Sequence, residues 1–332
     1  MVKTLGIGVI GCGGMGAHLG KTCLGVPNTK IVAAYDIAEK QAMTMASQFK
    51  CDYYTQIDGL LNRRDVDAVV VATPNYTHRE FTVAALKAGK HVFCEKPMAL
   101  KLEDCDAMID AAEKAGLTLM IGHVMRFYSG CASIKRAIAD GEIGQPIIGN
   151  VSRTGWIESG AWGQSWRRSR EKCGNSLFES TIHETDLMRW FMGDVESVQA
   201  YGFNFLHPEL NYDDCSVAIL RFENGALGTL ESGYSFRLGD HRVKVNGTVG
   251  AAHIDFRTST VKVIAEGKPE HVEPLITGID PVVAELQHFR DCILEERRPL
   301  TDGWEGRGAV EIATAINRSV ERGKPVKIPL LH

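Results

Sequence analysis

A glycine-rich turn near the amino terminus constrains the fold of this chain more than any other feature. Residues 11–16 read Gly-Cys-Gly-Gly-Met-Gly and follow an apolar run at Leu5–Ile10, and the next apolar run, at residues 31–35, is closed by Asp36. A Gly-x-Gly-x-x-Gly pattern between a strand and a helix, with an acid about 20 residues further on, is the fingerprint of a dinucleotide-binding unit. The pattern therefore predicts a doubly wound, parallel α/β fold.

The residues of this turn predict the cofactor. Gly11 permits the tight turn, Gly13 lets a diphosphate approach the backbone, and Gly16 lets the helix pack closely on the strand. The diphosphate is then bound by N–H groups at the amino end of the helix. Asp36 can accept hydrogen bonds from the adenosine ribose but repels a 2′-phosphate, for which Ile37 offers no compensating cation. We expect NAD rather than NADP, although a glycine turn beside an acidic strand end is the alternative.

The composition is that of an ordinary globular protein and argues against several kinds of partner. The chain has 332 residues, 44% hydrophobic and 23% charged, with a formal net charge of −4, and is long enough for two domains. Nucleic-acid partners require a basic face, and no stretch approaches a membrane span. Nine cysteines are scattered without a C-x-x-C pair, which favours reduced thiols. With no secretory segment before the first strand, we expect a cytoplasmic protein.

Two different patterns of predicted secondary structure divide the chain. Up to residue 122, strands and helices alternate, for example at His91–Cys94 and Leu102–Ala115, as in a doubly wound sheet. Later strand-like runs follow one another, with Asn224-Gly225 as a hairpin signal between two of them. We expect a Rossmann domain at 1–122 and, at 123–332, a substrate-binding α/β domain with a large open, mostly antiparallel sheet.

Polar residues follow two of the predicted parallel strands. Thr73-Pro74-Asn75 and Glu95-Lys96-Pro97 stand where each strand ends, and ligands of open α/β sheets bind outside the carboxyl ends of the strands. An enzyme that oxidises an alcohol with a nicotinamide needs a base for the hydroxyl proton and a group that stabilises the developing alkoxide. Lys96 can bind that hydroxyl, although a lone lysine is also explained as a solvated charge.

A second group of titratable residues lies in a predicted helix at 176–192. Offsets of four and three place Glu179, His183 and Asp186 on one helical face. Histidine exchanges protons near neutral pH, and a carboxylate one turn away can orient the imidazole or bind a hydroxyl. A packing helix whose histidine is satisfied by its neighbours fits the same spacing. We expect no metal site, because the nearby histidines and acids match no familiar ligand spacing.

Two further stretches carry side chains that suit a sugar. Trp162 and Trp166 precede basic residues at 167–170, and aromatic rings stack on the C–H faces of sugars while arginines bind hydroxyls or phosphates. An interface or a solvated basic loop explains this stretch equally well. Arg126 and Tyr128 follow the predicted strand that ends near residue 122 and are weaker candidates for the cleft.

A series of short motifs runs along nearly the whole chain. Beyond the glycine-rich turn it comprises Ala72-Thr73-Pro74-Asn75-x-x-His78, Glu95-Lys96-Pro97, Asp140-Gly141-Glu142-Ile143-Gly144-Gln145-Pro146, Trp166-Arg167, Ile182-His183-Glu184-x-x-Asp186 and Ala315-x-x-x-Ser319-x-x-x-Gly323. Together these motifs resemble the Gfo/Idh/MocA family of sugar and cyclitol oxidoreductases. The stretches around Met125-Arg126 and Ile182-His183-Glu184 are most similar to inositol dehydrogenases.

This resemblance implies roles for individual residues. Lys96 matches the family lysine that binds substrate and aids proton transfer, and His183 matches the catalytic histidine. Glu179 stands where the family usually has aspartate, and Gly174-Asn175 replaces the usual double glycine, which bears on substrate identity more than on reaction type. The family's second domain commonly forms dimers or tetramers through its sheet, so we expect a homodimer or homotetramer.

The residues and the resemblance together predict reversible, NAD-dependent oxidation of a secondary hydroxyl of a sugar, sugar derivative or inositol-like cyclitol, with Lys96, His183 and Glu179 as catalytic residues. A glycoside 3-dehydrogenase or aldose oxidoreductase with the same site, and a non-catalytic protein that senses sugar or NAD, are the alternatives. The expected cofactor contacts are Gly11, Gly13, Gly14, Met15, Gly16, Asp36, Ile37, Thr73, Pro74, Asn75, His78, Glu95 and Lys96. The expected substrate contacts are Lys96, Arg126, Tyr128, Trp166, Glu179, His183 and Asp186.

Overall fold

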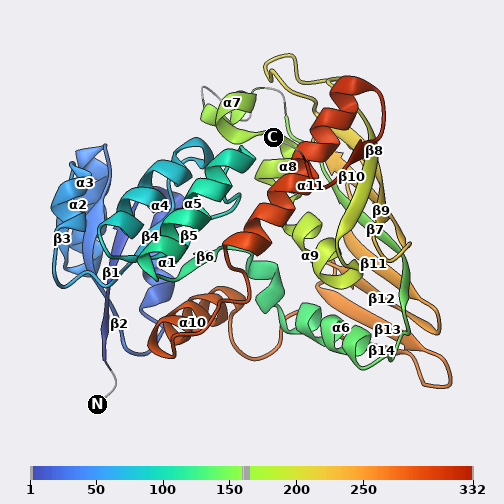
Figure 1. The fold of residues 1–332 in the computed structure, drawn as a ribbon, viewed down its shortest axis with the longest axis horizontal. Helices are drawn as coiled ribbons and strands as arrows, with labels where there is room; N and C mark the ends of the chain where they lie inside the picture. The colour runs from blue at the N-terminus through green and yellow to red at the C-terminus, as the bar shows by residue number, and fades with distance from the viewer. Residues whose placement is uncertain (1–2, 159, 161–164, 331–332) are drawn as a thin grey trace. The chain divides into compact units, whose positions relative to one another are not determined.

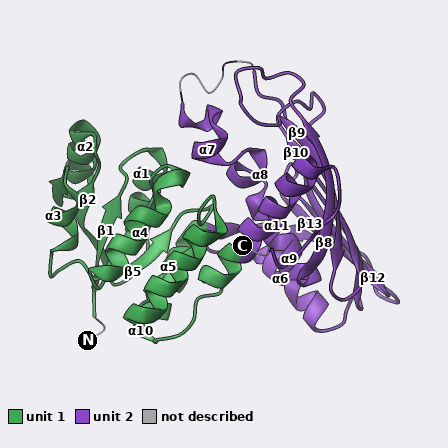
Figure 2. Ribbon diagram, turned by 45° about the horizontal axis from the view of Figure 1, so that its top comes forward, with its two compact units in different colours: residues 1–123, 282–307 green, residues 124–281, 308–332 purple. Residues whose placement is uncertain are grey.

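The computed structural model describes residues 3–158, 160 and 165–330, which divide into two compact units (Figure 2). Unit 1 consists of residues 1–123 and 282–307, and unit 2 of residues 124–281 and 308–332. The first change of unit lies beside the predicted domain boundary at 122/123. The return of residues 282–307 to unit 1 is not predicted from the sequence.

Residues 282–307 belong to unit 1 because they pack against its sheet. The ring of Phe289 meets the ring of Phe93 edge-on, with centroids 5.8 Å apart. The N–H of Ile121 donates a hydrogen bond to the carbonyl of Thr301 at 2.7 Å. Contacts between segments so far apart in sequence leave no local pattern, which is why the sequence does not reveal them.

Within the described residues, unit 1 holds a sheet of six parallel strands in the order β3-β2-β1-β4-β5-β6 (Figure 1). Its strands are β1 (Leu5–Ile10), β2 (Thr29–Tyr35), β3 (Asp52–Tyr54), β4 (Ala68–Val71), β5 (His91–Cys94) and β6 (Leu119–Ile121). Its helices are α1 (Gly14–Cys23), α2 (Glu39–Phe49), α3 (Ile57–Leu61), α4 (His78–Lys87), α5 (Leu102–Ala115) and α10 (Pro281–Leu294), with a 3₁₀ turn η1 (Asn75–Thr77). This strand order is that of the Rossmann fold and confirms the predicted class. Every residue of β1 and β4 is buried, as expected of parallel strands covered on both faces.

Within the described residues, unit 2 holds a sheet of nine strands in the order β14-β13-β12-β11-β7-β10-β9-β8-β15. The strands are β7 (Pro146–Thr154), β8 (Val195–Phe203), β9 (Cys215–Phe222), β10 (Leu227–Gly233), β11 (His241–Gly247), β12 (Gly250–Asp255), β13 (Thr260–Ala265), β14 (His271–Pro274) and β15 (Val326–Lys327). Only β7 and β10 pair in parallel there, so the predicted mostly antiparallel sheet is confirmed. Gly225, with φ +85°, makes the predicted turn between β9 and β10.

Helices lie along one face of this large sheet (Figure 2). They are α6 (Ser129–Ala139), α7 (Arg170–Cys173), α8 (Ser176–Glu179), α9 (Ile182–Met192) and most of α11 (Gly303–Arg322), with 3₁₀ turns η2 (Val124–Phe127) and η3 (Trp166–Arg168). Along β9 the residues alternate between buried and exposed, so one face of the strand packs on the helices and the other does not. Four strands of this sheet, β7, β12, β14 and β15, are absent from the sequence prediction. The burial pattern of β7 does not alternate regularly, β12 is rich in small residues, and β14 and β15 are short. No helix among residues 3–158, 160 and 165–330 combines the length and hydropathy of a transmembrane span.

The predicted single helix at 176–192 is wrong, because the chain breaks it into α8 and α9. The N–H groups of Ser180 and Thr181 both donate to the carbonyl of Ser176 at 3.0 Å, so the backbone is displaced by one residue between the two helices. The hydroxyl of Thr181 lies 2.7 Å from that of Ser232, which in turn bonds the hydroxyl of Ser176 at 2.9 Å. This buried hydroxyl network, anchored on β10, stabilises the break. Glu179 therefore does not belong to the helix that carries His183.

Candidate active site

The glycine-rich turn of unit 1 is shaped to receive a diphosphate. Gly11 has φ +94°, and a Cβ on Gly16 would lie 1.8 Å from the Gly11 carbonyl oxygen, so neither position accepts a side chain. A Cβ on Gly13 or Gly14 would meet nothing within 4 Å, which leaves this side of the turn open. Helix α1 begins at Gly14, and its N-cap residue, Gly13, has no side chain to bind the first N–H groups. These N–H groups fit the diphosphate of NAD.

Asp36 follows β2 with its carboxylate oriented by the backbone. Oδ2 accepts a hydrogen bond from the N–H of Cys12 and Oδ1 accepts one from the N–H of Ala38, both at 2.8 Å. A carboxylate has about four acceptor positions, so both oxygens keep capacity for ribose hydroxyls. Ile37 is 82% exposed and uncharged. Burial, with Asp36 nearby, raises the pKa of the Cys12 thiol to about 12, so this cysteine stays a neutral thiol in the turn.

The loops after β4 and β5 lie at the same sheet edge as the glycine-rich turn. Ile10, the last residue of β1, pairs with Val71, which pairs with Cys94. A Cβ on Gly11 would lie 2.7 Å from the carbonyl oxygen of Ala72, so the turn and the loop that carries Thr73 and Pro74 are in contact. The structure thus brings the predicted cofactor residues of unit 1 to one edge. Lys96 is half-buried there, and its N–H donates to Glu95 Oε2 at 3.1 Å.

Two of the predicted cofactor residues, His78 and Asn75, are buried in the structure. His78 is 1% exposed and Asn75 5% exposed, and both ring nitrogens of His78 lie at hydrogen-bond distance from backbone carbonyls. His78 therefore contacts the protein backbone rather than the cofactor, because both of its ring nitrogens face carbonyl oxygens of the chain. Only the tertiary contacts of the ring could reveal this.

In unit 2, Glu179 is held by an arginine. Arg167 Nε donates to Glu179 Oε1 at 2.6 Å, and the two side chains are 37% and 13% exposed. The guanidinium of Arg167 also stacks over the ring of Trp166, at 4.4 Å from its centroid. The Arg167 carbonyl accepts hydrogen bonds from Tyr212 Oη at 2.7 Å and from Cys173 Sγ at 3.2 Å. The predicted candidates Trp166 and Glu179 are therefore joined through Arg167, whereas the predicted candidate Trp162 lies outside the described residues.

The acidic residues at the start of α9 are buried against basic partners. Glu184 is 0% exposed, and its Oε1 accepts a hydrogen bond from His241 Nε2 at 2.5 Å. Asp186 is 1% exposed and receives two hydrogen bonds from Arg126, Nε to Oδ2 at 2.7 Å and Nη2 to Oδ1 at 2.6 Å. His183 directly precedes Glu184 in the sequence and is partly exposed. Of these three titratable side chains, His183 is the one accessible to a ligand.

The prediction that Arg126 and Asp186 contact substrate is corrected by this pairing. Both side chains are almost fully buried, at 2% and 1% exposure, and they satisfy each other in a bidentate ion pair. The guanidinium of Arg126 also lies 5.3 Å from the ring centroid of Trp190. Their role is to anchor α9, and hence His183, to η2. Tyr128 is half-buried with its ring 6.5 Å from that of Phe256, and its substrate contact stays a prediction.

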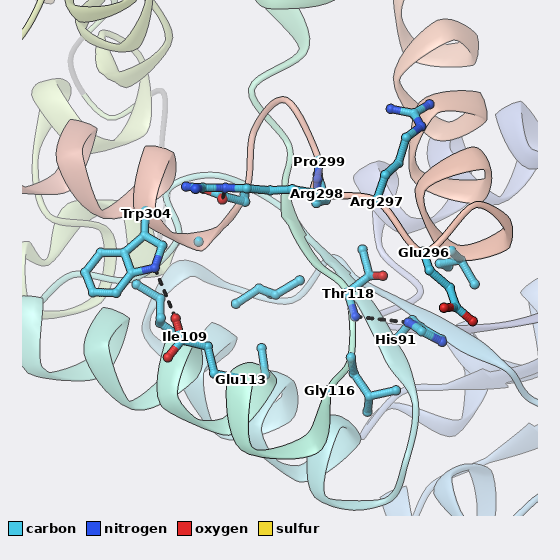
Figure 3. Close-up of a pocket in the computed structure, with 16 residues that line it drawn as sticks. His91, Ile109, Glu113, Gly116, Thr118, Glu296, Arg297, Arg298, Pro299 and Trp304 are labelled. Atoms are coloured by element: carbon cyan, nitrogen blue, oxygen red, sulfur yellow. Dashed lines mark hydrogen bonds and ion pairs between the residues drawn. The ribbon is translucent and has the colours of Figure 1, made fainter.

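A separate hollow of about 680 Å³ lies in unit 1 at the opposite edge of the sheet (Figure 3). It is bordered by His91, the first residue of β5, and by Trp304. Three of its polar side chains already bind within the protein: Trp304 Nε1 donates to Glu113 Oε1 at 3.2 Å, and His91 Nδ1 accepts the N–H of Thr118 at 3.0 Å (Figure 3). We therefore assign it no ligand. Among the described residues, no group of three His, Cys, Asp or Glu side chains could hold a metal ion.

The comparison with known families agrees with the fold. Residues 5–123 match the model of the oxidoreductase family's NAD-binding Rossmann fold, and residues 135–328 match that of its C-terminal α/β domain. The chain belongs to the Gfo/Idh/MocA oxidoreductase family. It is an NAD-dependent dehydrogenase acting on CH–OH groups, and the residues of its glycine-rich turn and Asp36 fit NAD.

Individual relatives are similar over most of the chain. A 2,7-anhydro-N-acetylneuraminate hydratase of Mediterraneibacter gnavus is 37% identical over 81% of this chain and 72% of its own length. The myo-inositol 2-dehydrogenase of Thermotoga maritima is 30% identical over 97% of this chain and 98% of its own. The crystal structure of an aldose–aldose oxidoreductase from Caulobacter crescentus superposes with a TM-score of 0.90 at 29% identity, covering 98% of this chain and 100% of that one.

Proposed function

We propose that this enzyme reversibly oxidises a secondary hydroxyl of a sugar, a sugar derivative or a cyclitol. The observation that carries the proposal is the start of α9, where Glu184 and Asp186 are buried against basic partners while His183 stays partly exposed. A hydroxyl that is oxidised must lose its proton, and an imidazole is suited to accept it near neutral pH. Relatives named inositol 2-dehydrogenase and aldose–aldose oxidoreductase support this substrate class.

Each residue has a defined task in this reaction. His183 accepts the hydroxyl proton, and Lys96 donates hydrogen bonds to the oxygen as negative charge develops on it. Glu179, oriented by Arg167, accepts a hydrogen bond from a neighbouring hydroxyl. NAD, when bound, would supply the nicotinamide that takes up the hydride from the carbon bearing this hydroxyl. The C–H and O–H bonds break, a carbonyl forms, and the proton leaves from His183.

The test is turnover with a panel of cyclitols, aldoses, glycosides and anhydro sugars, followed by the absorbance of reduced nicotinamide. We expect one polyol class to reduce NAD and its ketone to reoxidise NADH. Tight NAD binding in calorimetry without turnover of any panel member would instead favour the sugar- or NAD-sensing protein. Reduction of NAD by glycosides alone would favour the glycoside 3-dehydrogenase.

A second candidate is a redox-neutral conversion, favoured by the relative named 2,7-anhydro-N-acetylneuraminate hydratase. Oxidation of a substrate hydroxyl, with NAD as the hydride acceptor, would give a ketone that acidifies the neighbouring C–H bond. A ring oxygen two carbons from the carbonyl carbon could then be eliminated and water added, before the NADH formed in the first step returns its hydride to the ketone. Product analysis by NMR distinguishes the two candidates. The hydratase consumes an anhydro sugar without accumulating NADH, whereas the dehydrogenase forms ketone and NADH in equal amounts.

We also propose that a second copy of the chain covers the outer face of the large sheet. Tyr201, Phe203, Val217 and Ile219 are 45–72% exposed on β8 and β9, and Tyr201 pairs directly with Val217. A continuous row of apolar side chains on one face is suited to a symmetric, self-complementary contact. Sedimentation should show an oligomer that Ile219→Lys dissociates, and a monomeric wild type would contradict this proposal.

We propose a cytoplasmic location for the enzyme. All nine cysteines are free thiols, which persist in a reducing compartment. Cell fractionation checks this directly, and recovery outside the cytoplasm would overturn it.

A further inference from the structure

His78 is buried between the two loops that follow β4 and β5. The residue begins α4, and its side chain is 1% exposed. Nε2 lies 2.9 Å from the carbonyl oxygen of Thr73, and Nδ1 lies 2.8 Å from the carbonyl oxygen of Pro97. Carbonyl oxygens only accept hydrogen bonds, so a ring nitrogen bonds its carbonyl when it carries a hydrogen: a neutral imidazole donates to one of the two loops and an imidazolium to both. One rigid ring thus lies within hydrogen-bond distance of both loops.

The two loops carry different parts of the active site. The loop of Thr73 lies against the glycine-rich turn, since a Cβ on Gly11 would be 2.9 Å from Thr73 Cγ2. This loop has additional support, because the hydroxyl of Thr77 donates to the Pro74 carbonyl at 2.7 Å. The other loop carries Lys96 directly before Pro97. With a hydrogen on Nδ1, His78 therefore ties the backbone beside Lys96 to the loop that touches the cofactor turn.

We propose that His78 is a positioning residue that sets the place of Lys96 relative to the glycine-rich turn. His78 follows the loop of Thr73 directly in the chain, so the bond from Nδ1 to the Pro97 carbonyl is the contact that holds the Lys96 loop to it. The inference rests on the proposed function for its catalytic consequence, because Lys96 matters there as the group that steadies the substrate oxygen. Asp36, at the adenosine end of the cofactor site, follows β2 and does not belong to either of the two loops beside His78.

Amide side chains at residue 78 test separately the contact with the Pro97 carbonyl and the contact with the Thr73 carbonyl. The amide nitrogen of asparagine overlays Nδ1 of histidine, and that of glutamine overlays Nε2. His78→Asn therefore keeps a donor for the Pro97 carbonyl, His78→Gln keeps one for the Thr73 carbonyl, and His78→Leu keeps neither. Misplacement of a catalytic group by about 1 Å can cost roughly 10²-fold in rate.

We expect His78→Gln and His78→Leu to lower kcat roughly 10- to 100-fold while His78→Asn stays within about threefold of wild type. The Kd for NAD should be nearly unchanged in all three. His91→Gln is the matched control, because His91 is a half-buried histidine at the amino end of β5 that also accepts one backbone N–H, that of Thr118; its kcat should equal that of wild type. Equal losses in His78→Asn and His78→Gln, or wild-type kcat in His78→Gln, would overturn the proposal.

Amide hydrogen exchange on the cofactor-free protein provides a readout that needs no turnover. His78→Gln should accelerate exchange at residues 95–99 and leave residues 73–77 protected, whereas His78→Asn should do the reverse. Unchanged exchange at 95–99 in His78→Gln would contradict the proposal even if kcat falls. If the wild type turns over no polyol, the proposed function fails, and the exchange pattern still decides whether His78 holds the Lys96 loop.

Discussion

Arg167 binds Glu179 through a hydrogen bond of 2.6 Å between Nε and Oε1, in a pair that is 37% and 13% exposed. Glu179 occupies the position where the family usually has aspartate, and its longer side chain is oriented by this contact. The pair therefore links Glu179, where this sequence differs from the usual family residue, to the basic residues that follow Trp166. Substrate selectivity of this enzyme should depend on both residues together.

Shortening Glu179 tests this coupling. Glu179→Asp withdraws the carboxylate by about 1.5 Å and weakens its contact with Arg167, so we expect KM for the polyol to rise roughly tenfold with little change in kcat. Steady-state kinetics at saturating NAD measures both constants. The control is Glu196→Asp, which shortens a glutamate in the exposed pair with Arg221 and should change neither constant. A loss in kcat with unchanged KM would show that Glu179 acts in the chemical step.

Removal of the imidazole of His183 should abolish most proton transfer. We expect His183→Ala to lower kcat roughly 10²- to 10⁴-fold while the Kd for NAD, measured by calorimetry, stays constant. His271→Ala is the control, because His271 is an exposed histidine of β14. Near-normal turnover of His183→Ala on the best substrate would remove the histidine from the mechanism.

The carboxylate of Asp36 should determine the choice between NAD and NADP. Asp36→Ser removes the ribose acceptor and the charge that repels a 2′-phosphate, so we expect the Kd for NAD to rise roughly tenfold, about 1.4 kcal/mol, and NADP to bind measurably. Asp36→Asn keeps the size of the side chain and one acceptor oxygen, for the N–H of either Cys12 or Ala38, and controls for collapse of the turn. If the wild type turns over faster with NADP than with NAD, our assignment of Asp36 is wrong.

The buried pair of Arg126 and Asp186 should contribute to stability far more than surface pairs do. Removing one partner leaves a buried charge, so Arg126→Leu should lower the free energy of unfolding by about 3–5 kcal/mol. Urea unfolding followed by tryptophan fluorescence, to which Trp190 beside Arg126 contributes, measures this loss. Asp110→Asn, in the exposed pair with Lys114, is the control and should cost less than about 1 kcal/mol. Equal effects in the two variants would argue against an anchoring role.

Buried thiols should make the protein less stable at alkaline pH. Burial raises the pKa of Cys12, Cys23 and Cys94 from 9.0 to about 12. In the unfolded chain these thiols ionise first, so their contribution to stability is complete below pH 9.0 and is lost as pH rises toward 12. Urea midpoints across this range should fall, and Cys23→Ala should make the fall shallower. If Cys23→Ala leaves the fall of the urea midpoint with pH unchanged, ionisation of buried thiols does not cause that fall.

Much of the fold could be predicted because its signals are local. The apolar run before the glycine-rich turn, the acid at residue 36 and the Asn224-Gly225 hairpin each depend on neighbouring residues, and each element is present. The predicted helix at 176–192 failed because a hydroxyl network with Ser232, on another strand, interrupts it. Strand β7 was missed because its burial pattern does not alternate.

The sequence by itself determined the NAD-binding turn, the two kinds of sheet and the chemical character of Lys96, Glu179 and His183, since these follow from residue type and short spacing. The tertiary structure decided which polar groups remain available to a ligand. Asp186 is paired with Arg126, 60 residues away, and the ring nitrogens of His78 face the carbonyls of two loops. The physical reason is that a buried charge or ring nitrogen must find its partner through packing, and spacing along the chain does not reveal which distant residue supplies it.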